Sequence, residues 1–113
     1  MDVEFILKFL KDLARHNDRE WFEKNKPRYL QAKQNFEEVV QAVLNEVAKF
    51  DPRLEGLDAK KLPFRIYRDI RFSKDKRPYK VHMGAGFSPN GKLVQEPGYY
   101  LHIQPGNQSF VAG

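Results

Sequence analysis

The sequence predicts an α+β fold, in which N-terminal helices pack on one face of an antiparallel β-meander of three to four strands. Apolar residues recur every three or four positions through residues 1–51, which is the period of an amphipathic helix. From residue 62 onward the period changes to two, which is typical of half-buried strands, and turn residues separate the alternating runs. We therefore expect a single domain over residues 1–113, with a helical part over 1–51 and a β part over 62–113.

Three helices are expected in the helical part. The first carries one apolar stripe, made of Phe5, Ile6, Phe9, Leu10 and Leu13. Asn17 or Asp18 can cap a second, short helix, because both side chains accept hydrogen bonds from a first turn. Pro27 is tolerated in a first turn and begins the long third helix. That helix ends at Asp51, because the residue before a proline is disfavoured in the helical region.

The apolar seam of the third helix is expected to face the sheet. Its members step by threes and fours and are Tyr29, Ala32, Phe36, Val40, Val43, Val47 and Phe50. We expect the central four, Phe36, Val40, Val43 and Val47, to be buried against the sheet. Trp21, Phe22 and Tyr29 are interpreted as core residues.

Four strands are expected in the β part, each with alternate residues facing the helices. Their apolar residues are Phe64, Ile66, Ile70 and Phe72 in the first, Val81, Met83, Ala85 and Phe87 in the second, Tyr99, Leu101 and Ile103 in the third, and the run 109–112 in the fourth. Turn residues lie between the strands at 88–91, 97–98 and 105–107. Arg68 falls on the apolar side, so we expect either a bulge or a guanidinium paired with a carboxylate or with backbone carbonyls, and we interpret it as structural.

The positive charge of the chain is concentrated in one segment. The formal net charge is +5 at pH 7, while residues 1–63 and 81–113 each sum to zero. Residues 64–80 carry seven cations and two carboxylates, and seven minus two accounts for the whole excess. Basic side chains in a turn between strands suit phosphate or carboxylate groups, and the arginine fork can bind two oxygens. The sequence therefore predicts a binding module for an anionic partner, either a phosphorylated ligand or a nucleic acid.

The sheet face opposite the helices is expected to form a shallow trough. Alternation places Gly84 and Gly86 on that face, between cationic and aromatic walls. We expect ligand contacts from Arg65, Tyr67, Arg71, Lys74, Lys76, Arg77, Lys80 and Tyr100. An exposed sheet face is ordinarily polar, but this one is poor in acids and lacks the mixture of signs that a merely solvated face shows. Tyr67, Tyr100 and His102 offer flat rings on which nucleic acid bases can stack.

Two other functions remain open at this point. An enzyme acting on a small anionic substrate would use His82 or His102 as its acid or base, Asp69 to orient that histidine, and the arginines as a clamp. The same three residues would be the members of a metal triad, but their spacing is not a ligand motif and we expect no metal. A structural or assembly domain without a site of its own is the third possibility.

Several classes of site are excluded by what the sequence lacks. The chain has no cysteine, which excludes disulfides, iron–sulfur clusters and thiolate zinc sites. It has no Gly-rich phosphate loop that opens a helix, no metalloprotease motif and no nucleophile elbow, so we expect no cofactor. The first residues lack the pattern of a signal peptide, and no stretch is apolar enough to span a membrane. We therefore expect a cytoplasmic protein with no membrane partner.

Five stretches of the chain resemble one known family. They are FLKDL at 9–13, REWFEKNKPRY at 19–29, FRIYRDIRFSKDKRPYK at 64–80, PGYYLHI at 97–103 and SFVAG at 109–113. These stretches are similar to the domain of unknown function 2461 family, a conserved family of bacterial and fungal proteins, over nearly the whole chain. The resemblance implies no particular activity, cofactor or catalytic residue. Members of that family extend further, so the resemblance implies that this chain is an N-terminal portion whose strand edge is open to self-association.

Overall fold

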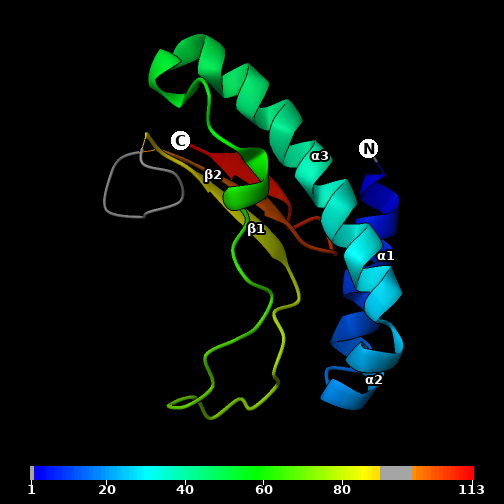
Figure 1. The fold of residues 1–113 in the computed structure, drawn as a ribbon. Coiled ribbons are helices and arrows are strands. Elements are labelled where there is room, and N and C mark those ends of the chain that lie inside the picture. The colour runs from blue at the N-terminus through cyan, green and yellow to red at the C-terminus, as the bar shows by residue number, and fades with distance from the viewer. Residues whose placement is uncertain (1, 90–97) are drawn as a thin grey trace.

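The computed structural model describes residues 2–89 and 98–113. Three helices come first and a three-stranded sheet follows (Figure 1). Their bounds are Val3–Arg15 for α1, Arg19–Lys24 for α2, Lys26–Phe50 for α3, Met83–Phe87 for β1, Tyr99–Ile103 for β2 and Phe110–Ala112 for β3. Two short 3₁₀ helices, η1 (Pro52–Leu54) and η2 (Ala59–Lys61), follow α3. The predicted α+β fold class is confirmed.

The helix boundaries follow from local chemistry. Asp18 caps α2, because its carboxylate accepts a hydrogen bond from the backbone N–H of Trp21 at 2.8 Å. Asn17, the other expected cap, instead makes hydrogen bonds with the backbone of Tyr79. Pro27 lies in the first turn of α3, and Pro52 begins η1 shortly after α3 has ended. In the described part of the chain, no helix combines the length and the apolar character needed to cross a membrane.

The sheet is an antiparallel meander with the strand order β1–β2–β3. Gly84 of β1 pairs with His102 of β2, and Gly86 pairs with Tyr100. His102 pairs in turn with Phe110 of β3. Directly paired residues lie on the same face of a sheet. These five residues therefore share one face, which we call the open sheet face.

The turns between the strands are only partly described. The expected turn at 105–107 is present, and Gly106 and Asn107 adopt left-handed φ angles of 81° and 60°. Of the expected turns at 88–91 and 97–98, residues 90, 91 and 97 lie outside the described residues. β3 is the last strand in the sheet order, and all three of its residues are exposed. Self-association through such an edge stays a prediction.

The core joins α1, α3 and one face of the sheet in a single apolar cluster. Phe36, Val40 and Val47 of α3 are buried, as the helical seam predicts, and Val43 is partly buried. The buried apolar residues of the sheet are Met83, Ala85, Phe87, Leu101 and Ile103. Of the three aromatic residues interpreted as core, Phe22 is fully buried and the other two are partly buried against the cluster.

The prediction of a first strand is wrong, because residues 64–72 form no regular strand. Residues 64–80 instead form an extended arm that leaves the sheet and returns to it (Figure 1). We call this segment the basic arm. Of the four apolar residues expected to face the core, Ile66 alone is buried, and Phe72 is 94% exposed.

Local hydrogen bonds replace the ladder that a strand over 64–72 would need. The carboxylates of Asp69 and Asp75 each accept a hydrogen bond from the N–H two residues onward, at 3.3 Å and 3.0 Å. The hydroxyl of Ser73 accepts one from the N–H of Asp75 at 3.1 Å. Side chains that bond to the nearby backbone in this way compete with strand pairing. Pro78 has no N–H to donate to a ladder.

The two sides of the basic arm change register before they join the sheet. Pro63 bridges Ala85, and Tyr67 bridges Tyr79, both in the antiparallel sense. Four positions separate residues 63 and 67 on the outgoing side of the arm, whereas six separate residues 79 and 85 on the returning side. The returning side therefore contains two extra residues. The chain bends at 81–82, directly before β1. Extra residues of this kind act as a bulge and re-aim the side chains that follow.

Candidate functional site

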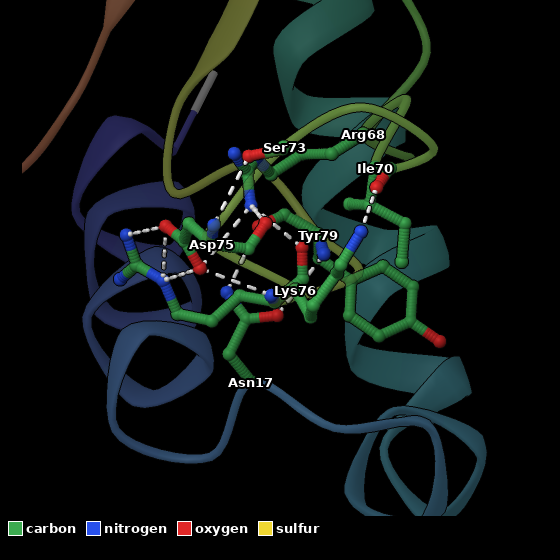
Figure 2. A network of polar contacts seen from close by, with 8 residues as sticks. Asn17, Arg68, Ile70, Ser73, Asp75, Lys76 and Tyr79 are labelled. Atoms are coloured by element: carbon green, nitrogen blue, oxygen red, sulfur yellow. Dashed lines mark hydrogen bonds and ion pairs between the residues drawn. The ribbon is translucent and has the colours of Figure 1, made fainter.

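The base of the basic arm is fixed to the loop between α1 and α2. The side-chain amide of Asn17 donates to the carbonyl of Tyr79 at 2.8 Å, and its oxygen accepts from the N–H of Tyr79 at 3.0 Å (Figure 2). The ring of Tyr79 stacks on the buried ring of Phe22, with centroids 4.1 Å apart. Tyr67, on the outgoing side of the arm, packs against both rings. Polar and aromatic contacts together therefore hold the arm against the helices.

Arg68 joins the two sides of the basic arm from within. Its Nη1 donates to the carbonyls of Arg77 at 2.8 Å and Asp75 at 3.2 Å, and lies 3.4 Å from Oδ1 of Asp75 (Figure 2). The backbone N–H of Arg68 donates to the carbonyl of Pro78 at 2.9 Å. The partly buried guanidinium is thus paired with a carboxylate and with backbone carbonyls, as its position in the sequence predicts. Its role is to hold the arm closed.

Two of the exposed arginines already have carboxylate partners. Nη2 of Arg71 lies 3.0 Å from Oδ2 of Asp69, and Nη2 of Arg77 lies 2.7 Å from Oδ2 of Asp75. Hydrogen bonds from Arg77 hold the pKa of Asp75 well below its usual range. Those from the Arg77 side chain have the larger effect, and the one from its backbone N–H has the next largest. The Arg71 side chain lowers the pKa of Asp69 in the same way. Solvent screens such exposed pairs, so they contribute little to stability and can exchange partners.

The remaining cations of the basic arm are engaged to different degrees. Arg65 and Lys74 are exposed, and Lys76 donates from Nζ to the carbonyl of Ile70 at 2.7 Å. Lys80 is half-buried where the arm returns towards the sheet. The arm is an extended segment (Figure 1), and its seven cations are distributed along its sequence from residue 65 to residue 80.

Phe72 lies in the turn at the outer end of the arm, and sequence reasoning missed it. Alternation predicts that this ring faces the core, but the buried residues of the arm are Ile66 and Tyr79, and the Phe72 side chain is 94% exposed. The guanidinium of Arg71 lies 5.8 Å from the ring centroid. The available signal was that Phe72 stands inside the densest run of charges, between Arg71 and Lys74. Apolar residues in such a run are poor candidates for burial.

The open sheet face brings the two candidate histidines together. The imidazoles of His82 and His102 stack with centroids 4.3 Å apart, and Phe110 stacks on His102 from β3 at 4.9 Å. Nε2 of His102 donates to Oε1 of Gln104 at 2.7 Å, since an amide oxygen only accepts. Nδ1 of the same ring lies 2.8 Å from the Tyr100 hydroxyl oxygen, within hydrogen-bond distance. Polar contacts at both ring nitrogens and stacking on His82 and Phe110 therefore hold the His102 ring in place.

Gly84 makes room for this arrangement. A Cβ at that position would lie 2.6 Å from the hydroxyl oxygen of Tyr100, so the tyrosine lies across the space that a larger residue would fill. The ring of Tyr100 also contacts Phe64 at 6.3 Å and Phe110 at 5.8 Å between centroids. Phe64, which alternation predicts to face the helices, thus contacts the open sheet face. Tyr100 is accordingly engaged by the protein through its hydroxyl and its ring.

Asp69 does not join the two histidines. Its carboxylate accepts hydrogen bonds from Arg71 within the basic arm. Among the described residues, no group of three histidines or acids is arranged to hold a metal ion. Burial lowers the pKa of His82 from its ordinary value of 6.5 to about 4, and the neighbouring imidazole adds to this effect. The His82 ring is therefore neutral at pH 7 and can accept a proton, but a pKa this far below 7 makes it a weak base.

The fold and these contacts define an α+β protein with a projecting basic arm and a histidine–tyrosine cluster on its open sheet face. The chain belongs to the family described as conserved hypothetical protein (DUF2461), which matches residues 5–113. The match includes the basic arm and all three strands. No curated protein and no solved structure matches the chain. The function therefore has to be argued from the site itself.

Proposed function

We propose that the protein binds a phosphate-bearing anionic partner, a nucleic acid, through the basic arm. The observation that supports this is that residues 64–80 carry the whole net charge of +5 and form a projecting arm (Figure 1). Charge of one sign that is concentrated on a protruding segment creates a local potential, which attracts polyanions and speeds their association. The rest of the chain carries as many acids as bases, so it adds no net attraction.

An extended polyanion suits the arm better than a small phosphorylated ligand does. Small-ligand sites are concave and bury most of the ligand, whereas these cations are spread along a ribbon. Repeated phosphates can meet Arg65, Lys74 and Arg77 one at a time. Arg71 and Arg77 can exchange an exposed carboxylate for a phosphate, which accepts two hydrogen bonds from the guanidinium fork. A small phosphorylated ligand is the alternative form of the same proposal.

The test is a fluorescence-anisotropy titration of a short single strand and of its duplex at several salt concentrations. If about four to six phosphates are engaged, log affinity for the duplex should fall with log salt at a slope of about −4 to −5. The single strand should give a shallower slope, at about −0.7 per phosphate. The triple variant Lys74→Ala, Lys76→Ala and Arg77→Ala should flatten the duplex slope by about two to three.

The matched control removes the same charge from the helical region, as Lys24→Ala, Lys26→Ala and Lys33→Ala. Lys24 is already paired with Glu20, and the region is balanced by acids, so the parent slope should be retained. Equal losses in the two triple variants would mean diffuse attraction and no site on the arm. If the parent binds neither oligonucleotide at low salt, the nucleic-acid form of the proposal fails. A titration with inorganic phosphate then tests the small-ligand form.

An enzyme acting on a small anionic substrate is the second candidate. The contact between His82, a neutral base, and the hydrogen-bonded ring of His102 favours it. In this candidate His82 would accept the proton, and arginines of the arm would bind the substrate. Inorganic phosphate should then shift the imidazole NMR signals of these two histidines at concentrations that leave His16 unchanged. If the signals of His82 and His102 shift no more than that of His16, or do not shift, the enzyme candidate fails. If the protein also binds no nucleic acid, an assembly domain is the remaining alternative.

A further inference from the structure

Phe72 is the most exposed large apolar side chain in the described part of the chain, at 94%. Phe50, at the C-terminal end of α3, follows at 82%. A single exposed apolar residue is common on protein surfaces. Phe72 differs from such residues because it lies at the outer end of a braced arm and within the segment that carries the excess charge.

The turn that carries Phe72 is braced by hydrogen bonds. The N–H of Ser73 donates to the carbonyl of Ile70 at 3.3 Å, and Nζ of Lys76 donates to the same carbonyl at 2.7 Å (Figure 2). Arg68 closes the arm directly behind this turn. A ring presented on a pre-formed loop loses less conformational entropy when a partner binds. The tip is therefore suited to recognition and is more than a solvated loop.

Cations accompany Phe72 on both sides along the chain. The guanidinium of Arg71 lies 5.8 Å from the ring centroid, and the exposed Lys74 follows two positions after the ring. A flat apolar ring between cations matches a nucleic acid base between its two phosphates. The base can stack on the ring while the phosphates meet the cations.

The other rings expected to stack on bases already have partners within the protein. Tyr67 packs on other rings at the base of the arm. Tyr100 packs against aromatic neighbours on the open sheet face. Phe72, in contrast, contacts no other ring among the described residues, and the Arg71 guanidinium over one face of its ring leaves the side chain 94% exposed. The ring of Phe72 is therefore available to a ligand.

We propose that Phe72 stacks on an unpaired base, so that the partner of the arm is a single-stranded or looped nucleic acid. This inference rests on the proposed function and deepens it by naming the feature that the arm recognises. Bases inside a duplex are stacked on one another, whereas unpaired bases can be splayed out onto aromatic side chains. A ring at the end of a ribbon therefore gains a base contact only where pairing is absent.

An anionic lipid surface fits the tip less well. Anionic headgroups would meet the same cations and the same two carboxylates, Asp69 and Asp75, as a nucleic acid would, so charge does not separate the two partners. Interfacial binding depends on a broad apolar face, and Ile70, the other apolar residue of the tip, is half-buried. One ring is enough for one base.

The test compares Phe72→Ala with Phe50→Ala, a matched loss of an exposed phenylalanine outside the arm. The affinity for a short oligothymidylate is measured by anisotropy at several salt concentrations. Phe72→Ala should weaken binding by about 5- to 150-fold, which corresponds to the loss of one base–aromatic stack. The salt slope should not change, because no phosphate contact is removed. Phe50→Ala should leave both quantities at the parent values.

Two further substitutions separate stacking from apolar contact. Phe72→Trp should keep the parent affinity, because it retains an aromatic face, while Phe72→Leu should behave like Phe72→Ala. Salt-dependent binding that is equally strong in Phe72→Ala and Phe50→Ala would overturn the stacking inference and leave the proposed function standing. Binding to phosphatidylserine vesicles that needs Phe72, without oligothymidylate binding, would overturn both in favour of a lipid surface.

Discussion

Asn17 and Tyr79 exchange two hydrogen bonds although 62 positions separate them in the sequence. Tyr79 faces Tyr67 in an antiparallel bridge whose hydrogen bonds are made by the flanking residues. The N–H and carbonyl of Tyr79 therefore point away from the arm, towards the helices. The Asn17 amide satisfies both groups at once, as a neighbouring strand would. This contact couples the basic arm to the helical layer.

Asn17→Ala should detach the base of the arm. It leaves two partly buried backbone groups of Tyr79 without their partners, and such a loss costs about 1–3 kcal/mol of unfolding free energy. Chemical denaturation measures this change. Hydrogen exchange at the amide of Tyr79 should accelerate as well.

Asn45→Ala is the control for that substitution. Asn45 is exposed on α3 and accepts a hydrogen bond from Gln41 at 2.9 Å, so its loss should change stability by no more than about 0.5 kcal/mol. An Asn17→Ala protein as stable as the Asn45→Ala protein, with unchanged exchange at Tyr79, would show that the arm does not depend on this contact.

Gly84→Ala should disturb the cluster on the open sheet face. The added Cβ would meet the Tyr100 hydroxyl oxygen at 2.6 Å, which forces the ring away from His102. Overpacking of this kind destabilises by about 1–3 kcal/mol, measured by thermal or chemical unfolding. Tyr100→Phe removes the closest clashing atom, so the double variant should be more stable than the sum of the single effects. Strictly additive effects would show that the close approach has been relieved elsewhere.

The stability of the protein should depend on His82 below neutral pH. Burial lowers the pKa of this histidine to about 4, against 6.5 when it is unfolded, so the unfolded chain takes up the proton first. The contribution of His82 is therefore complete above about pH 6.5 and declines as the pH falls towards 4. Unfolding titrations across this window should show the decline in the parent and a weaker one in His82→Gln. Identical profiles would contradict the assignment.

The helices could be predicted from the sequence because their determinants are local. Apolar periodicity, Pro27 and a capping Asp or Asn lie within a few residues of the structure that they specify. What the sequence left open was which of Asn17 and Asp18 is the cap. That choice depends on Tyr79, whose backbone needs the amide of Asn17 and which lies far along the chain.

The basic arm could not be predicted in the same way. Alternating apolar and polar residues in 64–72 are typical of a strand with one buried face. The alternation does not show whether another part of the protein packs against that face. Asp69 and Asp75 bind the local backbone, and the helices do not extend beneath the tip, so Phe72 is exposed. Strand parity places His82 and His102 on one face only if the alternation of β1 continues back to residue 82, where the chain bends. The stack itself depends on tertiary contacts that parity does not contain.

NMR mapping tests the central claim, that the basic arm is where an anionic partner binds, most directly. Isotope-labelled protein is titrated with a short single-stranded oligonucleotide at low salt. We predict that the shifted amides lie within 64–80, are strongest around 71–77, and return to their free positions when salt is added. The competing basic surface on α1, where Lys8, Lys11 and Arg15 line an open groove, should not shift. Shifts centred on that groove, with 64–80 unchanged, would contradict the claim.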